Sequence, residues 1–159
     1  MADTIDVTPL TPEDRQWLAG RAVELWGAEF IISRGVAHHI AELPGFIARI
    51  DGQRVGVATY RFGESDCELV SIDALQPHIG VGSALLATVK SIAAGRRLWL
   101  ITTNDNLDAI RFYQRRGFVL TAVYPGAIEQ SRTLKPQIPR VGNYGIPIRD
   151  ELVFTLVPD

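Results

Sequence analysis

Hydrophobic and polar residues alternate along much of the chain with two different periods. Strict alternation predicts strands, whereas apolar residues three or four positions apart predict helices. Alternating segments lie at residues 5–10 and 67–75, further segments that predict strands at 45–62, 98–102, 118–124 and 150–157, and helical segments at 12–26, 83–95 and 106–116. The Asp51-Gly52 pair divides 45–62 into two strands, because it tolerates the positive φ angles of a tight hairpin turn.

Residues that commonly cap helices mark several of the predicted helix ends. Thr11 is a candidate N-cap, with Pro12 at the first helical position and Asp14 three residues after the cap. Gly95 and Gly117 stand where a helix C-terminus often needs a left-handed residue. These signals set the boundaries of the predicted helices.

Two segments are less regular than the rest. Residues 33–43 predict a second, weaker helix that ends at Pro44, with His38 and His39 on a partly exposed face. Residues 131–148 contain several prolines and glycines and little periodicity, which predicts a long loop before the last strand. Long loops in compact domains are more often functional than inert.

The order of the predicted elements indicates the fold class. Three consecutive strands between residues 45 and 75 form an antiparallel meander, and a helix, a strand, a second helix and another strand follow. A strand that follows a helical connection pairs in parallel, so parallel pairing is expected beside the meander. We predict an α/β (α+β) fold with a mixed, mostly antiparallel sheet flanked by helices, in a single domain over residues 1–159.

Composition and charge narrow the classes of function. The chain has 159 residues, of which 47% are hydrophobic and 21% charged, as in an ordinary globular domain. A net charge of −2 argues against nucleic-acid partners, which a clearly basic domain would bind. An acidic, polar start and the lack of a long apolar run predict no membrane partner and a cytoplasmic location. Cys67 is the single cysteine, and the few Cys and His residues lack ligand spacing, so we expect no disulfide and no metal.

A glycine turn between strand 67–75 and helix 83–95 is the clearest sign of a binding site. Gly80 and Gly82 precede the helix, whose first backbone amides are left unpaired and attract phosphate. Taken alone, the turn is equally well explained by chain geometry. Leu85 occupies the position of the third glycine of a nicotinamide-cofactor fingerprint, which disfavours that class of cofactor.

Two separated segments together resemble the GNAT superfamily of acyl-CoA-dependent N-acyltransferases. HIGVGSALL, from His78, is similar to the pyrophosphate loop of that family, and NLDAIRFYQRRGF, from Asn106, to its second cofactor-contacting segment. The order of elements agrees with the family from Ile5 to Val157, although only 67–118 is motif-specific. Pro77 and Ile79 depart from the pattern, because the family usually has Gln or Arg at the first place and often a basic residue at the second.

The resemblance implies an acetyl-CoA site between strands 67–75 and 98–102. Strand residues would offer backbone groups to the pantetheine arm, amides of the turn would hold the pyrophosphate, and the second segment would line the other side. In chain order these residues are Asp73, Ala74 and Leu75; His78, Ile79, Gly80, Val81, Gly82, Ser83 and Ala84; and Asn106, Ala109 and Tyr113. Without a fixed cation before Gly80, binding of the anion is expected to depend mainly on amides and the helix dipole.

The same resemblance assigns two catalytic residues. Glu68 lies where several members of the family place a general base, which must take a proton from the amine. A solvated glutamate at a strand end explains it equally well, and Asp73 is less suited because it is near the pantetheine-binding part. Tyr113 is the expected acid, since a phenol with a pKa of about 10 can protonate a thiolate of pKa about 8.5. The alternative is a core aromatic.

We therefore predict an N-acetyltransferase that moves an acetyl group from acetyl-CoA directly to a small-molecule or peptide amine. The alternatives are an acyl-CoA-binding sensor without turnover and a nucleotide-binding oxidoreductase. A homodimer is left open. Arg132, Lys135, Arg140 and Arg149 give the late loop a basic character that a solvated loop explains better than an anion site.

Overall fold

The computed structural model describes residues 4–76 and 79–156. The helices are α1 (Pro12–Trp26), η1 (Ile40–Glu42), α2 (Val81–Ile92), α3 (Leu107–Gln114), α4 (Ala127–Leu134) and η2 (Asn143–Gly145). The strands are β1 (Asp6–Pro9), β2 (Phe30–Ser33), β3 (Val36–His39), β4 (Gly45–Ile50), β5 (Gln53–Phe62), β6 (Asp66–Ala74), β7 (Arg97–Thr103), β8 (Phe118–Tyr124) and β9 (Glu151–Leu156).

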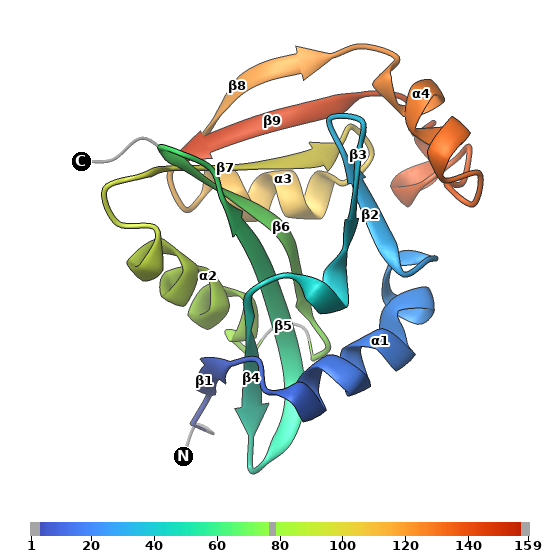
Figure 1. Cartoon of the computed structure of the whole chain (residues 1–159). Coiled ribbons are helices and arrows are strands. Elements are labelled where there is room, and N and C mark those ends of the chain that lie inside the picture. The colour runs from blue at the N-terminus through green and yellow to red at the C-terminus, as the bar shows by residue number, and fades with distance from the viewer. Residues whose placement is uncertain (1–3, 77–78, 157–159) are drawn as a thin grey trace.

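Seven strands form one mixed sheet in the order β1-β4-β5-β6-β7-β9-β8. β6 and β7 pair in parallel and the other neighbours in this sheet pair antiparallel, which confirms the predicted sheet. Figure 1 shows β7, β9 and β8 running across one end of the half that contains β4, β5 and β6. The sheet therefore opens where its two halves meet, between β6 and β7.

The helices cover opposite faces of the sheet (Figure 1). Apolar side chains of α2 and α3 pack against one face in the larger core cluster, which includes Leu85, Leu86 and Tyr113. On the other face, Leu18 of α1 packs against Ile47 of β4 in a second cluster. Leu69 of β6 belongs to the first cluster and Val70 packs against the second, so buried apolar surface on both faces holds the strand from which the site is built.

Gly56 allows α2 to approach the sheet closely. A Cβ atom at this position would collide with the Val81 side chain and would lie 3.0 Å from a Leu85 methyl carbon. Val81 is the first residue of α2. A glycine in β5 thus sets the position of the α2 N-terminus, which the sequence marks as an anion site.

The predicted cap of α1 and the predicted meander are confirmed. The Asp14 amide donates to Thr11 Oγ1 at 3.2 Å, and the Thr11 amide donates to Asp14 Oδ2 at 3.1 Å, which completes a capping box. Asp51 and Gly52 have φ angles of 50° and 78° between β4 and β5. Both features depend on residues close together in the sequence, where local chemistry predicts structure well.

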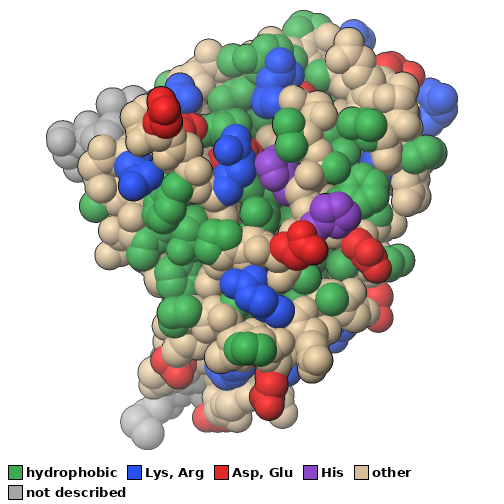
Figure 2. Space-filling view, viewed as in Figure 1, with side chains coloured by type: hydrophobic (Ala, Val, Ile, Leu, Met, Phe, Trp, Pro, Cys, Tyr) green, Lys and Arg blue, Asp and Glu red, His purple; other side chains and the backbone are tan. Residues whose placement is uncertain are grey.

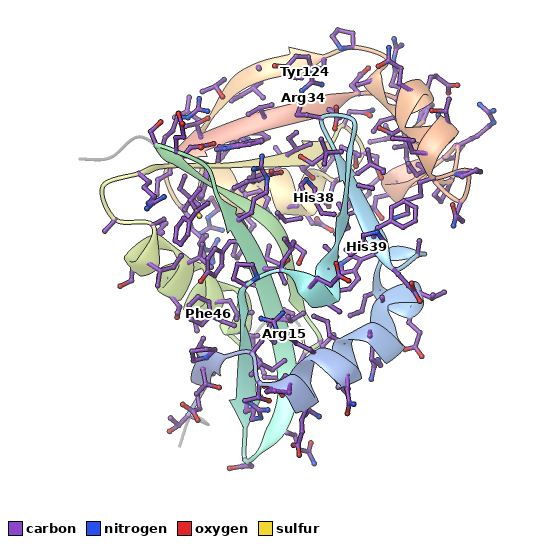
Figure 3. All side chains as sticks on the ribbon, in the orientation of Figure 1. Arg15, Arg34, His38, His39, Phe46 and Tyr124 are labelled. Atoms are coloured by element: carbon purple, nitrogen blue, oxygen red, sulfur yellow. The ribbon has the colours of Figure 1, made fainter. Side chains whose placement is uncertain are left out.

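The predicted helix over residues 33–43 is wrong, because β2 and β3 form a hairpin there and only η1 is helical. Arg34 and Gly35 adopt φ angles of 48° and 77°, which makes a tight turn between the strands. Figure 3 shows Arg34 at the tip of the hairpin, beside Tyr124 of β8. Its guanidinium carbon lies 3.3 Å from the centre of that ring.

The hairpin gives the two histidines different environments (Figure 3). His38 is 9% exposed, whereas His39 is exposed and lies with its ring 5.9 Å from the ring of Phe30. Successive residues of a strand point to opposite sides. The partly exposed face predicted for both therefore holds for His39 alone.

The sequence analysis did not predict α4, which begins before the predicted loop over residues 131–148 and overlaps it at residues 131–134. Gly126 is its N-cap with a φ of 74° and gives no side-chain capping bond. Ile128 and Ser131 are buried on one side of the helix. A helix of eight residues with one short apolar face gives little periodic signal.

No helix within the described ranges is long and apolar enough to cross a membrane. On the face shown in Figure 2, Lys and Arg side chains are interspersed with Asp, Glu and apolar side chains.

Candidate active site

A cleft opens where β6 and β7 separate. The two strands pair only from Asp66 to Glu68 on β6, after which β6 continues to Ala74 and β7 to Thr103. The cleft between them has a volume of about 320 Å³. Its walls include Asp73 from β6 and Asn106 and Tyr113 from the α3 segment, so three predicted residues meet there.

The edge of β6 that faces the cleft carries unpaired backbone groups. The Leu75 amide donates to the Val55 carbonyl at 2.8 Å, on the β5 side. Because the direction of backbone groups alternates along a strand, the amides of Ile72 and Ala74 point to the opposite edge. These two amides can donate to a ligand, whereas the Leu75 amide, predicted as a backbone contact of the pantetheine arm, is already bonded.

Tyr113 is held rigidly at the wall of the cleft. It is 8% exposed and packs edge-on against Phe112 and Phe118, with ring centres 5.5 and 5.6 Å away. Burial, together with the nearby Asp73 carboxylate, raises the pKa of the Tyr113 hydroxyl. The phenol therefore stays protonated at neutral pH. Asn106 is fixed beside it, with Nδ2 donating to Thr102 Oγ1 at 3.1 Å.

Asp73 is the carboxylate among the described residues that line this cleft. Its Oδ2 accepts a hydrogen bond of 2.8 Å from the indole Nε1 of Trp26, at the end of α1. Burial raises the pKa of Asp73 to about 6, although the bond from Trp26 opposes this shift. Such a carboxyl group is ionised at neutral pH and is basic enough to accept a proton.

Glu68 lies on the same face of β6 but does not border the cleft. It is 2% exposed, so the solvated strand-end glutamate considered from the sequence is wrong. Its Oε2 accepts from Ser33 Oγ at 2.5 Å and its Oε1 from Arg61 Nε at 2.9 Å. Both oxygens are therefore engaged, by the hairpin on one side and by β5 on the other.

A second hollow, of about 430 Å³, adjoins the N-terminus of α2. Gly80 is the N-cap, with a φ of 84°. Ala74, Gly80, Val81, Gly82 and Ser83 all line the hollow, as the sequence analysis predicts for residues that contact the cofactor. The Ala84 amide donates to the Gly80 carbonyl at 3.0 Å and is not available, so the free amides of the helix belong to residues 81–83.

Arginines from α3 and the turn that follows it supply the positive charge that the glycine turn lacks. Arg111, Arg115 and Arg116 line the same hollow. Arg116 donates from Nη2 to Ser83 Oγ at 2.7 Å and from Nη1 to the Phe112 carbonyl at 3.0 Å. Its guanidinium lies 3.7 Å from the centre of the Phe112 ring. Cations from another part of the chain therefore adjoin the glycine turn, although the position before Gly80 itself holds the uncharged Ile79.

Ile79 and Ala109, two further predicted cofactor residues, line neither space. Ile79 is 44% exposed and Ala109 packs against the core, whereas His78 lies outside the described residues. Lys135, expected on a solvated loop, is 8% exposed and lines the cleft between β6 and β7. Its Nζ donates to the carbonyls of Trp26 and Phe30 at 2.6 and 3.1 Å. In the described part of the chain, no three His, Cys, Asp or Glu residues are grouped so as to hold a metal ion.

Comparisons with known proteins agree with this arrangement. The sequence pattern of the Acetyltransferase (GNAT) family matches residues 12–118. The uncharacterized protein YdhI of Bacillus subtilis is 45% identical over 139 residues, which cover 84% of this chain and 86% of YdhI.

Solved structures show the same fold. A GNAT family acetyltransferase from Elizabethkingia anophelis with acetyl-CoA bound has a TM-score of 0.65 at 18% identity, covering 97% of this chain and 98% of that one. Arabidopsis thaliana Naa50, in complex with the bisubstrate analogue CoA-Ac-MVNAL, has a TM-score of 0.64 at 17% identity, covering 96% and 98%. The chain belongs to the GNAT family of acetyltransferases.

Proposed function

We propose that the protein transfers an acetyl group from acetyl-CoA directly to the nitrogen of an amine. The observation that carries this proposal is the opening between β6 and β7, where the Tyr113 phenol and the Asp73 carboxyl group lie beside unpaired strand amides. The hollow at the α2 N-terminus provides amides and arginines for an anion. GNAT acetyltransferases act on amine acceptors, and a cleft of this kind suits such a reaction.

The residues present fit acetyl-CoA. Free amides of residues 81–83 and the Arg116 guanidinium would hold phosphate groups, and the amides of Ile72 and Ala74 would bond the pantetheine arm or the thioester oxygen. When bound, acetyl-CoA supplies the reactive thioester. An amide from this stretch of β6 would stabilise negative charge on the carbonyl oxygen during attack.

Tyr113 would give a proton to the departing sulfur. Its raised pKa keeps the hydroxyl protonated until a thiolate develops nearby. Since a thiol has a pKa of about 8.5, proton transfer from a phenol completes its departure once the carbon–sulfur bond breaks. The position of Tyr113 in the wall of the cleft supports this role.

The geometry favours Asp73 over Glu68 as the group that takes a proton from the amine. Asp73 borders the cleft, and only one of its oxygens accepts a hydrogen bond from the described residues, namely from Trp26. Both Glu68 oxygens accept hydrogen bonds, one from Ser33 of the hairpin and one from Arg61 of β5. A base must come within hydrogen-bond reach of the proton that it removes. If Asp73 is the base, Glu68 has a structural role. It would hold Arg61 and Ser33 in place without contacting the reacting atoms.

A screen of amines for acetyl-CoA consumption, with mass detection of the product, tests the proposal. We expect an acetylated amine to form together with one equivalent of free CoA. Acetyl-CoA binding without turnover on any amine class would favour the alternative of an acyl-CoA-binding sensor. Stabilisation by NAD or NADP but not by acetyl-CoA, in a thermal-shift assay, would contradict the acyl-CoA site altogether.

A further inference from the structure

A third hollow, of about 510 Å³, borders the cleft on the side of α1 and the β2–β3 hairpin. It shares Trp26, Ile31, Thr103 and Lys135 with the cleft, so the two spaces adjoin. The end of α1, β2 and the segment from α4 to Ile148 form its walls. None of the described residues that the resemblance assigns to acetyl-CoA lines this hollow, which we call the side pocket.

Aliphatic side chains make up most of the wall of the side pocket, including Leu25, Ile31, Ile32, Ile128, Ile138 and Ile148. No carboxylate is among the described residues that line it. Lys135 contributes a cation, but two of its three donors are bonded to the carbonyls of Trp26 and Phe30. The side pocket therefore suits an apolar body better than a charged one.

The carboxylate of Asp73 in the adjoining cleft complements a single ammonium group. Asp73 stands in the cleft, and its Oδ2 is held by Trp26, which also lines the side pocket. A ligand with its apolar part in the side pocket can thus present one nitrogen towards Asp73. A polyamine or aminoglycoside carries further ammonium groups, which would be buried without carboxylate partners at a high cost in free energy.

We propose that the acceptor is a primary amine on an uncharged aromatic or branched aliphatic body, with the body in the side pocket and the nitrogen at Asp73. This inference rests on the proposed function. Asp73 takes one proton from the ammonium group, and the nitrogen then bonds to the acetyl carbon as the carbon–sulfur bond breaks. Tyr113 protonates the sulfur, a second proton leaves the nitrogen for solvent, and the products are an acetamide and free CoA.

Competition between amine classes tests the inference. The probes are 2-phenylethylamine, L-phenylalanine, spermidine and the peptide MVNAL with a free N-terminus. We expect kcat/KM for 2-phenylethylamine to exceed the others by at least about tenfold, because burial of several apolar carbons contributes more than 1.4 kcal/mol. A preference for spermidine, L-phenylalanine or the peptide would overturn the inference and leave acetyl transfer standing. Lack of product with every amine would overturn both.

Variants of the side pocket provide a second test. Ile138→Asn and Ile148→Asn each place a polar group in the wall at partly exposed positions. We expect kcat/KM for 2-phenylethylamine to fall about tenfold, while KM for acetyl-CoA stays unchanged. Ile146→Asn is the matched control, since Ile146 is a partly exposed isoleucine of the same segment outside the side pocket. An equal effect of all three substitutions, or no effect of any, would contradict the proposed pocket.

Discussion

Trp26 and Asp73 join the end of α1 to the open edge of β6, because the indole Nε1 donates to Asp73 Oδ2 at 2.8 Å. The bond holds the carboxylate in the cleft, against a tryptophan that lines both the cleft and the side pocket. It leaves the second oxygen of Asp73 for an acceptor. This relationship connects the helix that shapes the acceptor side with the strand that would bind acetyl-CoA.

Replacing the two carboxylates of β6 separates their roles. We expect Asp73→Asn to lower kcat about 10²-fold or more, as loss of a general base usually does, with acetyl-CoA binding retained. Glu68→Gln should lower the melting temperature, because Arg61 loses its buried ionic partner, but should keep kcat within a few-fold of wild type. Steady-state kinetics and thermal melts of both variants check this. A larger loss of kcat in Glu68→Gln than in Asp73→Asn would instead identify Glu68 as the general base.

The pH dependence of activity should report Asp73. Burial raises the pKa of its carboxyl group from 3.8 to about 6, and the base must be ionised to act. We expect kcat/KM of wild type to lose activity below pH about 6 more steeply than protonation of the amine alone predicts. Asp73→Asn should lack this additional loss, and an unchanged acidic limb in that variant would exclude Asp73 as its source.

Stability should respond to Asp73 with the opposite trend. A raised pKa means that the folded protein binds this proton more tightly than the unfolded chain between pH 3.8 and about 6. The contribution of Asp73 to the free energy of unfolding therefore falls as pH rises through that range. We compare the melting temperature of Asp73→Asn with that of wild type at pH 4 and at pH 8. The difference, variant minus wild type, should be larger at pH 8, because only wild type loses the contribution of the Asp73 proton. An equal difference at both values would contradict the raised pKa.

Arg116 should contribute to acetyl-CoA binding and not to the chemical step. We expect Arg116→Gln to raise KM for acetyl-CoA about tenfold, since a hydrogen bond to a charged group contributes about 1.5–3 kcal/mol, with little change in kcat. The KM of wild type should also rise with salt more steeply than that of the variant. Arg97→Gln, an exposed arginine at the start of β7, is the control and should change neither value.

Lys135, at the end of α4, should stabilise the fold through its buried hydrogen bonds to the end of α1 and the start of β2. Lys135→Met leaves the carbonyls of Trp26 and Phe30 without their donor, which should cost about 1–3 kcal/mol and lower the melting temperature by several degrees. Arg140→Met serves as the control, because the Arg140 side chain is 79% exposed. Equal melting temperatures of the two variants would contradict the role of Lys135.

Signals from residues close together in the sequence predicted the fold well. The arrangement of the site depends on contacts between residues that are far apart in the sequence. The Thr11–Asp14 capping box and the Asp51-Gly52 turn follow from adjacent residues, and the two motif segments indicated the opening between β6 and β7. Trp26 and Asp73 are 47 residues apart, and no periodic pattern relates them.

The sequence did not predict the arginines beside the α2 N-terminus or the β2–β3 hairpin, and the two reasons are related. Arg116 reaches Ser83 only because α3 packs beside the start of α2, which the sequence of the glycine turn does not encode. Arg34 takes a positive φ angle that non-glycine residues adopt rarely, so propensity does not predict a turn there. Tertiary packing determines both features.

Release of CoA and formation of acetylated amine by Tyr113→Phe test the central claim most directly. Single-turnover reactions with saturating acetyl-CoA should give equal amounts of both products with wild type. The variant should bind acetyl-CoA with similar affinity but form product at least about 10²-fold more slowly, because the leaving sulfur lacks its proton donor. Product formation by Tyr113→Phe at the wild-type rate would contradict the assignment of Tyr113 as the acid.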